Sequence, residues 1–229
     1  MPPRRSSLLS SQANRRQSRA ACLPIILLPL AGILGLVTFI ALLAGNNYLF
    51  LAQPYGPGAT AQPGHLAAFF SPTVKFWGAS IESWAAQWSL EPNLVATVMQ
   101  IESCGDPQAV SPAGATGLFQ VMPFHFQQGD SLQDPNTNAS RGLAFLKESL
   151  DTAHGEVRLA LASYNGGTDL ISLDESLWPD ETIQYTYWGT AIYQDAQRGA
   201  SASQVLNQWK AHNGWRLCLQ ASQRLGVYP

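Results

Sequence analysis

The chain has 229 residues, with 13 basic and 15 acidic side chains and a formal net charge of −2. Five of the basic residues are arginines that precede position 20, where no acid occurs, so the remainder carries a net charge of −7. This length allows one domain with an appendage, because domains commonly span about 100–200 residues. The acidic remainder argues against nucleic acid as a partner, since phosphate binding requires a basic surface.

The N-terminal region contains an uncharged, apolar run of 22 residues, from Leu23 to Ala44. A bilayer-spanning helix needs about 20 apolar residues, whereas the apolar part of a signal peptide has about 7–15. The preceding arginines predict a cytoplasmic N-terminus. We therefore expect a basic tail (1–22), a transmembrane anchor (23–44) and a Pro/Gly-rich linker (45–71). The alternative is a long signal peptide that is cleaved to give a secreted protein. Either interpretation places the rest outside the cytoplasm.

Helical periodicity dominates the remainder of the chain. The expected helices cover about residues 74–88, 92–103, 134–151, 157–165, 180–198, 203–211 and 215–225. Asp180 is expected to cap its helix, and Ser201 or Ser203 the next one. No segment shows sustained β alternation, and at most a short hairpin is expected between Ala109 and Val121. The predicted fold class is mainly α, preceded by a single N-terminal transmembrane helix.

The helix over 92–103 delivers one carboxyl group, Glu102, directly after an apolar stretch that ends at Ile101. Partial removal of a carboxyl from water raises its pKa and keeps it protonated. Cleavage of an acetal bond near neutral pH requires such an acid. Glu102 is therefore the candidate catalytic acid, and the alternative is a surface glutamate at a helix end.

Three sequence blocks around this residue resemble a known family. Glu102-Ser103 is followed by Gly-Leu-Phe-Gln at 117–120, then by Ala-Ser-Tyr-Asn-Gly-Gly at 162–167, and finally by Glu181-Thr182 with Tyr185. Their order and spacing are similar to those of the soluble lytic transglycosylase (SLT) catalytic domain, a lysozyme-like helical domain. The resemblance covers about residues 90–196. It implies a catalytic domain over 72–200 and a C-terminal helical extension over 201–229.

The resemblance implies cleavage of the β-1,4 bond between N-acetylmuramic acid and N-acetylglucosamine in peptidoglycan. One glutamate, Glu102, would act first as acid and then as base on the C6 hydroxyl of the same sugar, giving a 1,6-anhydro product. The implied substrate-binding residues are Ser103, Gln120, Tyr164, Asn165, Glu181 and Tyr185. The alternative role of Ser103 is to hydrogen-bond backbone groups at the end of its helix, and that of Glu181 is only to cap the start of its helix. Phe119 replaces the methionine common in the family.

Two further features bear on the site. Cys104 and Cys218 would both lie outside the cytoplasm, where disulfides persist. A bridge between them is expected over two free thiols. The four histidines are scattered without metal-binding spacing, so neither a metal nor a cofactor is expected.

The sequence thus predicts a membrane-tethered, extracytoplasmic lytic transglycosylase whose partners are peptidoglycan strands and the membrane. It predicts no nucleic-acid partner and does not indicate protein partners. One alternative is a hydrolytic muramidase on the same scaffold, in which water replaces the C6 hydroxyl. The other is a glycan-binding module without catalysis, which retention of Glu102 disfavours.

Overall fold

The computed structural model describes residues 66–228, with the side chain at position 213 excepted. The elements in chain order are α2 (Pro72–Phe76), α3 (Gly78–Trp88), α4 (Pro92–Glu102), η1 (Pro123–His125), α5 (Pro135–Thr152), α6 (Val157–Gly166), η2 (Thr168–Ser172), η3 (Glu175–Leu177), α7 (Asp180–Gln197), α8 (Gln204–Trp209), the π-helical turn η4 (Lys210–Gly214) and α9 (Trp215–Leu225). The expected mainly helical fold is confirmed for this part of the chain. The expected membrane span at 23–44 lies outside the described residues. Between 66 and 228, no helix combines the length and apolar character needed to cross a bilayer.

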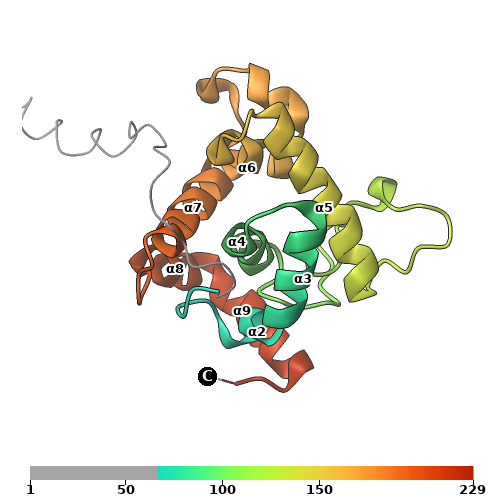
Figure 1. The fold of residues 1–229 in the computed structure, drawn as a ribbon, viewed down its shortest axis with the longest axis vertical. Coiled ribbons are helices and arrows are strands. Elements are labelled where there is room, and N and C mark those ends of the chain that lie inside the picture. Colours follow the sequence, from blue (N-terminus) through green and yellow to red (C-terminus); the bar gives the residue numbers. More distant parts are fainter. Residues whose placement is uncertain (1–65, 229) are drawn as a thin grey trace, which may run out of the picture. The chain divides into compact units, whose positions relative to one another are not determined.

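Helix α4 is the centre of the packing, and Figure 1 shows it surrounded by the other helices. It contacts α2, α3 and α7. Pro92 occupies the first turn, where a missing N–H costs nothing, and the Glu91 carboxylate accepts a hydrogen bond from the Leu94 N–H at 2.9 Å. Every residue from Asn93 to Gln100 is buried. A helix that is buried on all sides holds its last residue, Glu102, in a fixed position.

The segment expected as one amphipathic helix over 74–88 is two helices, so that prediction was wrong. Helix α2 ends at Phe76, α3 starts at Gly78, and Trp77 lies between them. The indole N–H of Trp77 donates to the Gly105 carbonyl at 2.9 Å. This tertiary contact fixes the chain direction at the break, which periodicity alone does not reveal. The packed region also begins before α2, because Phe70 is 1% exposed.

The segment from Cys104 to Met122 contains no regular strand. Thr116 forms isolated antiparallel bridges with Val110 and with Val121, which is less than the short hairpin allowed by the sequence. The start of α7 also differs from expectation. Pro179 is its N-cap residue, and Asp180 lies in the first turn. Asp180 therefore does not cap the helix, although its charge favours the positive end of the helix dipole.

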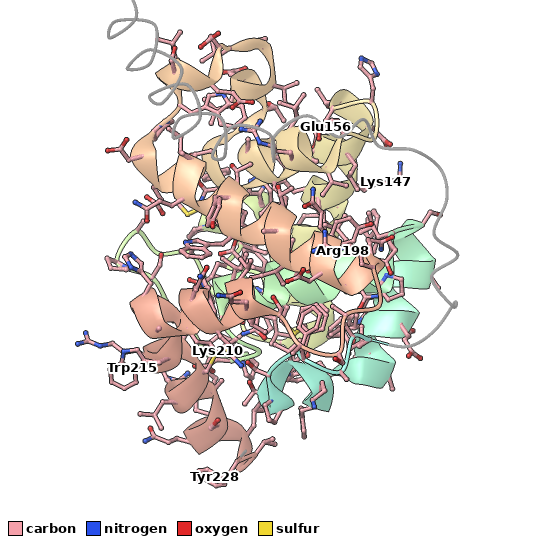
Figure 2. The ribbon with its side chains drawn as sticks, turned by 90° about the vertical axis from the view of Figure 1, so that its left-hand side faces the viewer. Lys147, Glu156, Arg198, Lys210, Trp215 and Tyr228 are labelled. Atoms are coloured by element: carbon pink, nitrogen blue, oxygen red, sulfur yellow. A yellow bond between two sulfur atoms is a disulfide. The ribbon has the colours of Figure 1, made fainter. Side chains whose placement is uncertain are left out.

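The C-terminal segment packs against the loop that follows α4. Ser203 caps α8 by accepting from the Leu206 N–H, and α8, η4 and α9 continue one another. A disulfide joins Cys104 to Cys218 on α9. Much of α9 faces solvent, and Figure 2 shows at the surface Trp215, its first residue, and Tyr228, which follows its C-terminal end. Their exposed fractions are 51% and 65%.

Candidate active site

The carboxyl group of Glu102 lies at the C-terminal end of α4, where α7 packs against it. The Tyr185 hydroxyl on α7 donates a hydrogen bond of 2.7 Å to Glu102 Oε1. Burial raises the pKa of Glu102 to about 8, the Tyr185 hydrogen bond lowers it, and the charge of Glu181 raises it. The raised pKa keeps Glu102 protonated at neutral pH, as the sequence predicts. A protonated carboxylic acid beside a tyrosine can donate a proton to a substrate oxygen.

Tyr164, on α6, lies within electrostatic range of the same carboxyl group. Its hydroxyl donates to the Phe119 carbonyl at 2.8 Å, so the ring joins α6 to the loop before η1. Burial and the charge of Glu102 raise the pKa of Tyr164 well above its usual value. The same two causes raise the pKa of Tyr185. Both hydroxyls therefore remain protonated donors throughout the physiological range. The structure thus brings together Glu102, Tyr164, Tyr185 and, within electrostatic range, Glu181.

Gly142 on α5 makes this arrangement sterically feasible. A β-carbon at that position would lie 2.6 Å from the Phe119 Cβ and 3.1 Å from the Tyr164 hydroxyl. Phe119 is itself fully buried and packs edge-on against Trp84, with ring centroids 6.1 Å apart. Phe119 therefore belongs to the core, and its side chain does not line an open surface. The role of Gly142 was not predictable from the sequence, because the contact joins residues far apart in the chain.

Ser103 and Gln120 are engaged by the backbone of the loop. The buried Ser103 hydroxyl donates to the Leu118 carbonyl at 2.7 Å and accepts from the Gly105 N–H at 3.1 Å. The half-buried Gln120 donates its amide N–H groups to the carbonyls of Ala109 and Gly117. Within the described part of the chain, its amide oxygen accepts no hydrogen bond, which leaves that oxygen available to a ligand N–H. Ser103 has the geometry of its alternative interpretation, the satisfaction of a helix end.

Asn138 holds the Gly-Leu-Phe-Gln loop against α5 and was assigned no such role from the sequence. Its side chain is fully buried, donates to the carbonyls of Thr116 and Leu132, and accepts from the Phe119 N–H at 2.9 Å. Gly117, with φ +79°, allows this contact, because a β-carbon there would lie 2.4 Å from the Asn138 amide nitrogen. The asparagine in the first turn of α5 was the available signal, but its neighbours could not be deduced.

Asn165 and Glu181 lie where α6 meets α7. The Asn165 side-chain oxygen accepts a hydrogen bond of 2.7 Å from the Thr182 hydroxyl, which ties two of the sequence blocks together. Glu181 is exposed in the first turn of α7. Among residues 66–228, no three histidine, cysteine or acidic side chains are placed to hold a metal ion.

A buried carboxylate, Asp106, anchors the C-terminal helix behind this site. It is 1% exposed and accepts hydrogen bonds from the Gln220 amide at 2.8 Å and the Arg224 guanidinium at 3.3 Å. Gln100, within α4, donates to the sulfur of Cys104 at 3.0 Å. The disulfide and these polar contacts fasten α9 to the residues that directly follow Glu102.

Comparison with known proteins shows that part of the helical region is similar to a known family. Residues 79–177 match the family model described as the transglycosylase SLT domain. The chain is 39% identical over 111 residues to the "Transglycosylase" of Enterobacteria phage PRD1, covering 48% of this chain and 40% of that protein. It is 32% identical over 83 residues to the "Endo-type membrane-bound lytic murein transglycosylase A" of Klebsiella pneumoniae (strain 342), covering 31% of this chain and 41% of that protein.

A solved structure of an inactive mutant of the lytic transglycosylase Slt from Pseudomonas aeruginosa is also similar. The TM-score is 0.45 at 24% sequence identity, with 53% of this chain and 24% of that chain covered. The chain spans about two fifths of the length of the two relatives. The matched region, 79–177, contains Glu102, Gln120, Tyr164 and Asn165. Over this region the chain is therefore similar to the transglycosylase SLT domain family.

Proposed function

We propose that this protein is a peptidoglycan lytic transglycosylase that cleaves the β-1,4 bond between N-acetylmuramic acid and N-acetylglucosamine. The observation that carries this proposal is the carboxyl group of Glu102, which has a pKa of about 8 and a hydrogen bond from Tyr185. The SLT domain match and the names of the relatives support the reaction class. Both the activity and the substrate of the whole protein are part of the proposal.

The first step is protonation of the leaving oxygen. Glu102 gives its proton to the glycosidic oxygen, the bond from that oxygen to C1 breaks, and positive charge develops on the muramic acid ring. Glu102 is then a carboxylate, which the Tyr185 hydroxyl stabilises by its hydrogen bond. A raised pKa favours this first step, because the acid is protonated before reaction at neutral pH.

The second step closes the anhydro ring. The Glu102 carboxylate takes the proton of the C6 hydroxyl as the C6 oxygen bonds to C1, which restores the protonated acid without consuming water. One carboxyl suffices, because the nucleophile is held within the same sugar at a high effective concentration. A muramidase would instead direct water to C1, and only its products would carry a free reducing end.

The remaining predicted site residues receive different proposed roles. Gln120 and Glu181 are the proposed glycan contacts, because the Gln120 amide oxygen accepts no hydrogen bond within residues 66–228 and Glu181 is exposed. Tyr164 and Tyr185 orient the acid, since their hydroxyls lie beside Glu102 or its supporting loop. For Ser103 and Asn165 we propose support of the loop and the helix pair, based on their hydrogen bonds.

We further propose that the catalytic domain (72–200) and its C-terminal extension (201–229) face outward from a membrane, anchored by the run at 23–44. The apolar length of that run and the preceding arginines support this arrangement. The bridge between Cys104 and Cys218 fits an oxidising compartment. Added protease should degrade the C-terminal part from outside intact spheroplasts. Protection of that part until lysis would contradict the proposed orientation.

The activity is tested with purified, dye-labelled peptidoglycan and the full chain in detergent micelles. The parent should release soluble labelled fragments, whereas Glu102→Gln should reduce release by at least about 1,000-fold, because the transition state loses its only proton donor. Glu82→Gln, which removes an exposed carboxyl on α3, is the matched control and should retain the parent rate. Equal release by Glu102→Gln and the parent would overturn the assignment.

A further inference from the structure

Four aromatic rings form a continuous row that leads from the surface to the surroundings of Glu102. The ring centroids of Phe124 and His125 are 4.5 Å apart, those of His125 and Phe145 are 4.8 Å apart, and those of Phe145 and Tyr164 are 5.6 Å apart. At the inner end, Tyr164 lies within electrostatic range of Glu102. We call these four residues the aromatic row. The function derived above uses only its inner member.

The outer end of the row is exposed to solvent. Phe124 is 75% exposed, the highest fraction among the exposed large apolar side chains between 66 and 228. It lies in η1, in the loop that Figure 1 shows beside α5. A fully apolar ring held in water gains nothing for folding, because little of its surface is buried. Its position at the end of a row of rings therefore indicates a ligand with an apolar face.

The loop that carries Phe124 is fastened to α5. Arg141 donates to Asp130 through Nε at 2.7 Å and through a terminal nitrogen at 3.2 Å, and Asp130 also accepts from the Gln127 N–H. Asn138 holds the Leu132 carbonyl at 3.0 Å, and on the N-terminal side of Phe124 it accepts from the Phe119 N–H at 2.9 Å. Both ends of the loop are thus attached to the helix that bears Phe145. An attached loop lowers the entropy cost of ordering the ring when a ligand binds.

We propose that Phe124 and His125 bind a pyranose ring of the glycan strand by stacking, several sugar units away from the bond at Glu102. This inference rests on the proposed function. β-1,4-linked sugars with equatorial substituents present C–H groups on the two faces of each ring, and these weakly positive groups are attracted to the negative face of an aromatic ring. The row contains no carboxylate or permanent cation, so it fits the uncharged sugar ring and not the stem peptide. Stacking at these residues would make the protein bind long glycan strands in preference to short fragments.

The test measures binding in the full chain in detergent micelles, with Glu102→Gln as the background that blocks turnover. The probes are β-1,4-linked N-acetylglucosamine oligomers of six and of two sugars, titrated by calorimetry. Phe124→Ala should weaken binding of the six-sugar probe by about three- to tenfold, which is ~0.7–1.4 kcal/mol. Its effect on the two-sugar probe should be smaller, because that probe does not span from Glu102 to the row. Phe124→Trp keeps a stacking face and should restore the affinity.

The matched control is Phe76→Ala, which removes a 55% exposed phenylalanine on α2 that takes no part in the row. It should bind both probes like the background. Unchanged affinity of Phe124→Ala, or equal weakening in Phe76→Ala, would overturn the inference. Failure of the background to bind the six-sugar probe would also overturn it, provided that the parent releases fragments from peptidoglycan. A parent that does neither would refute the proposed function as well.

Discussion

Glu102 should lower the stability of this protein at alkaline pH, and its removal should reverse that effect. The folded-state pKa of about 8 exceeds the ordinary value of 4.5, so the folded state binds more protons than the unfolded chain between these two pH values. The free energy of unfolding therefore falls as pH rises through this window and is constant above it. Full conversion, at about 1.4 kcal/mol per pH unit, gives an upper limit of ~5 kcal/mol. Because the Glu102 side chain keeps partial contact with solvent, which weakens the effect, we expect a loss of about 2–4 kcal/mol of unfolding free energy.

The assay is chemical denaturation of the parent and of Glu102→Gln at pH 5 and pH 9, with the disulfide kept intact. At pH 5 the two proteins should have similar free energies of unfolding, and at pH 9 Glu102→Gln should be more stable by the stated amount. Taking the difference removes the contribution of all other titrating groups. Glu82→Gln should follow the parent at both pH values. A difference between parent and Glu102→Gln that is the same at pH 5 and pH 9 would refute the raised pKa.

Three further outcomes are expected. The value of kcat/KM should be level below about pH 8 and fall above it. In Tyr185→Phe this fall should move to higher pH, because the hydrogen bond from Tyr185 lowers the pKa of Glu102 and its removal raises that pKa; an unmoved profile would contradict that role. Replacing both Cys104 and Cys218 by serine should cost about 4–5 kcal/mol of unfolding free energy, because the bridge closes a loop with a sequence separation of 114; denaturant titration yielding an unchanged midpoint would count against it. Gly142→Ala should cost about 1–3 kcal/mol and reduce activity, whereas Gly78→Ala, whose nearest neighbour lies at 3.8 Å, should have little effect on either; equal melting temperatures would contradict the packing argument.

Local sequence features predicted most helices and the acid. Pro92 and the run of apolar residues predicted α4, and the position of Glu102 after Ile101 predicted a raised pKa. These predictions depend on spacing within a single helix, which the sequence displays directly. Helix starts were less predictable, because the N-cap position can fall on a residue without a capping side chain, as it does at Pro179 before α7.

Apart from the expected bridge between Cys104 and Cys218, features that depend on tertiary contacts were not predictable. The hydrogen bond from Tyr185 to Glu102 joins residues 83 positions apart, and that from Tyr164 to the Phe119 carbonyl joins residues 45 apart. The break at Trp77 likewise depends on a bond to Gly105, 28 positions away. The three sequence blocks indicated that some of these residues act together, but not which atoms meet. The hydrogen bonds that Asn138 makes to the loop were indicated in the sequence only by an asparagine near a helix start.

The central claim is that Glu102 alone supplies the proton and then recovers it from the C6 hydroxyl of the substrate. Mass spectrometry of the muropeptides released from purified peptidoglycan tests this most directly. We expect products lighter by one water than hydrolytic fragments, with no label incorporated from ¹⁸O water. Glu102→Gln should release none of these products. Products that carry a reducing end with ¹⁸O from the solvent would contradict the account and identify a muramidase.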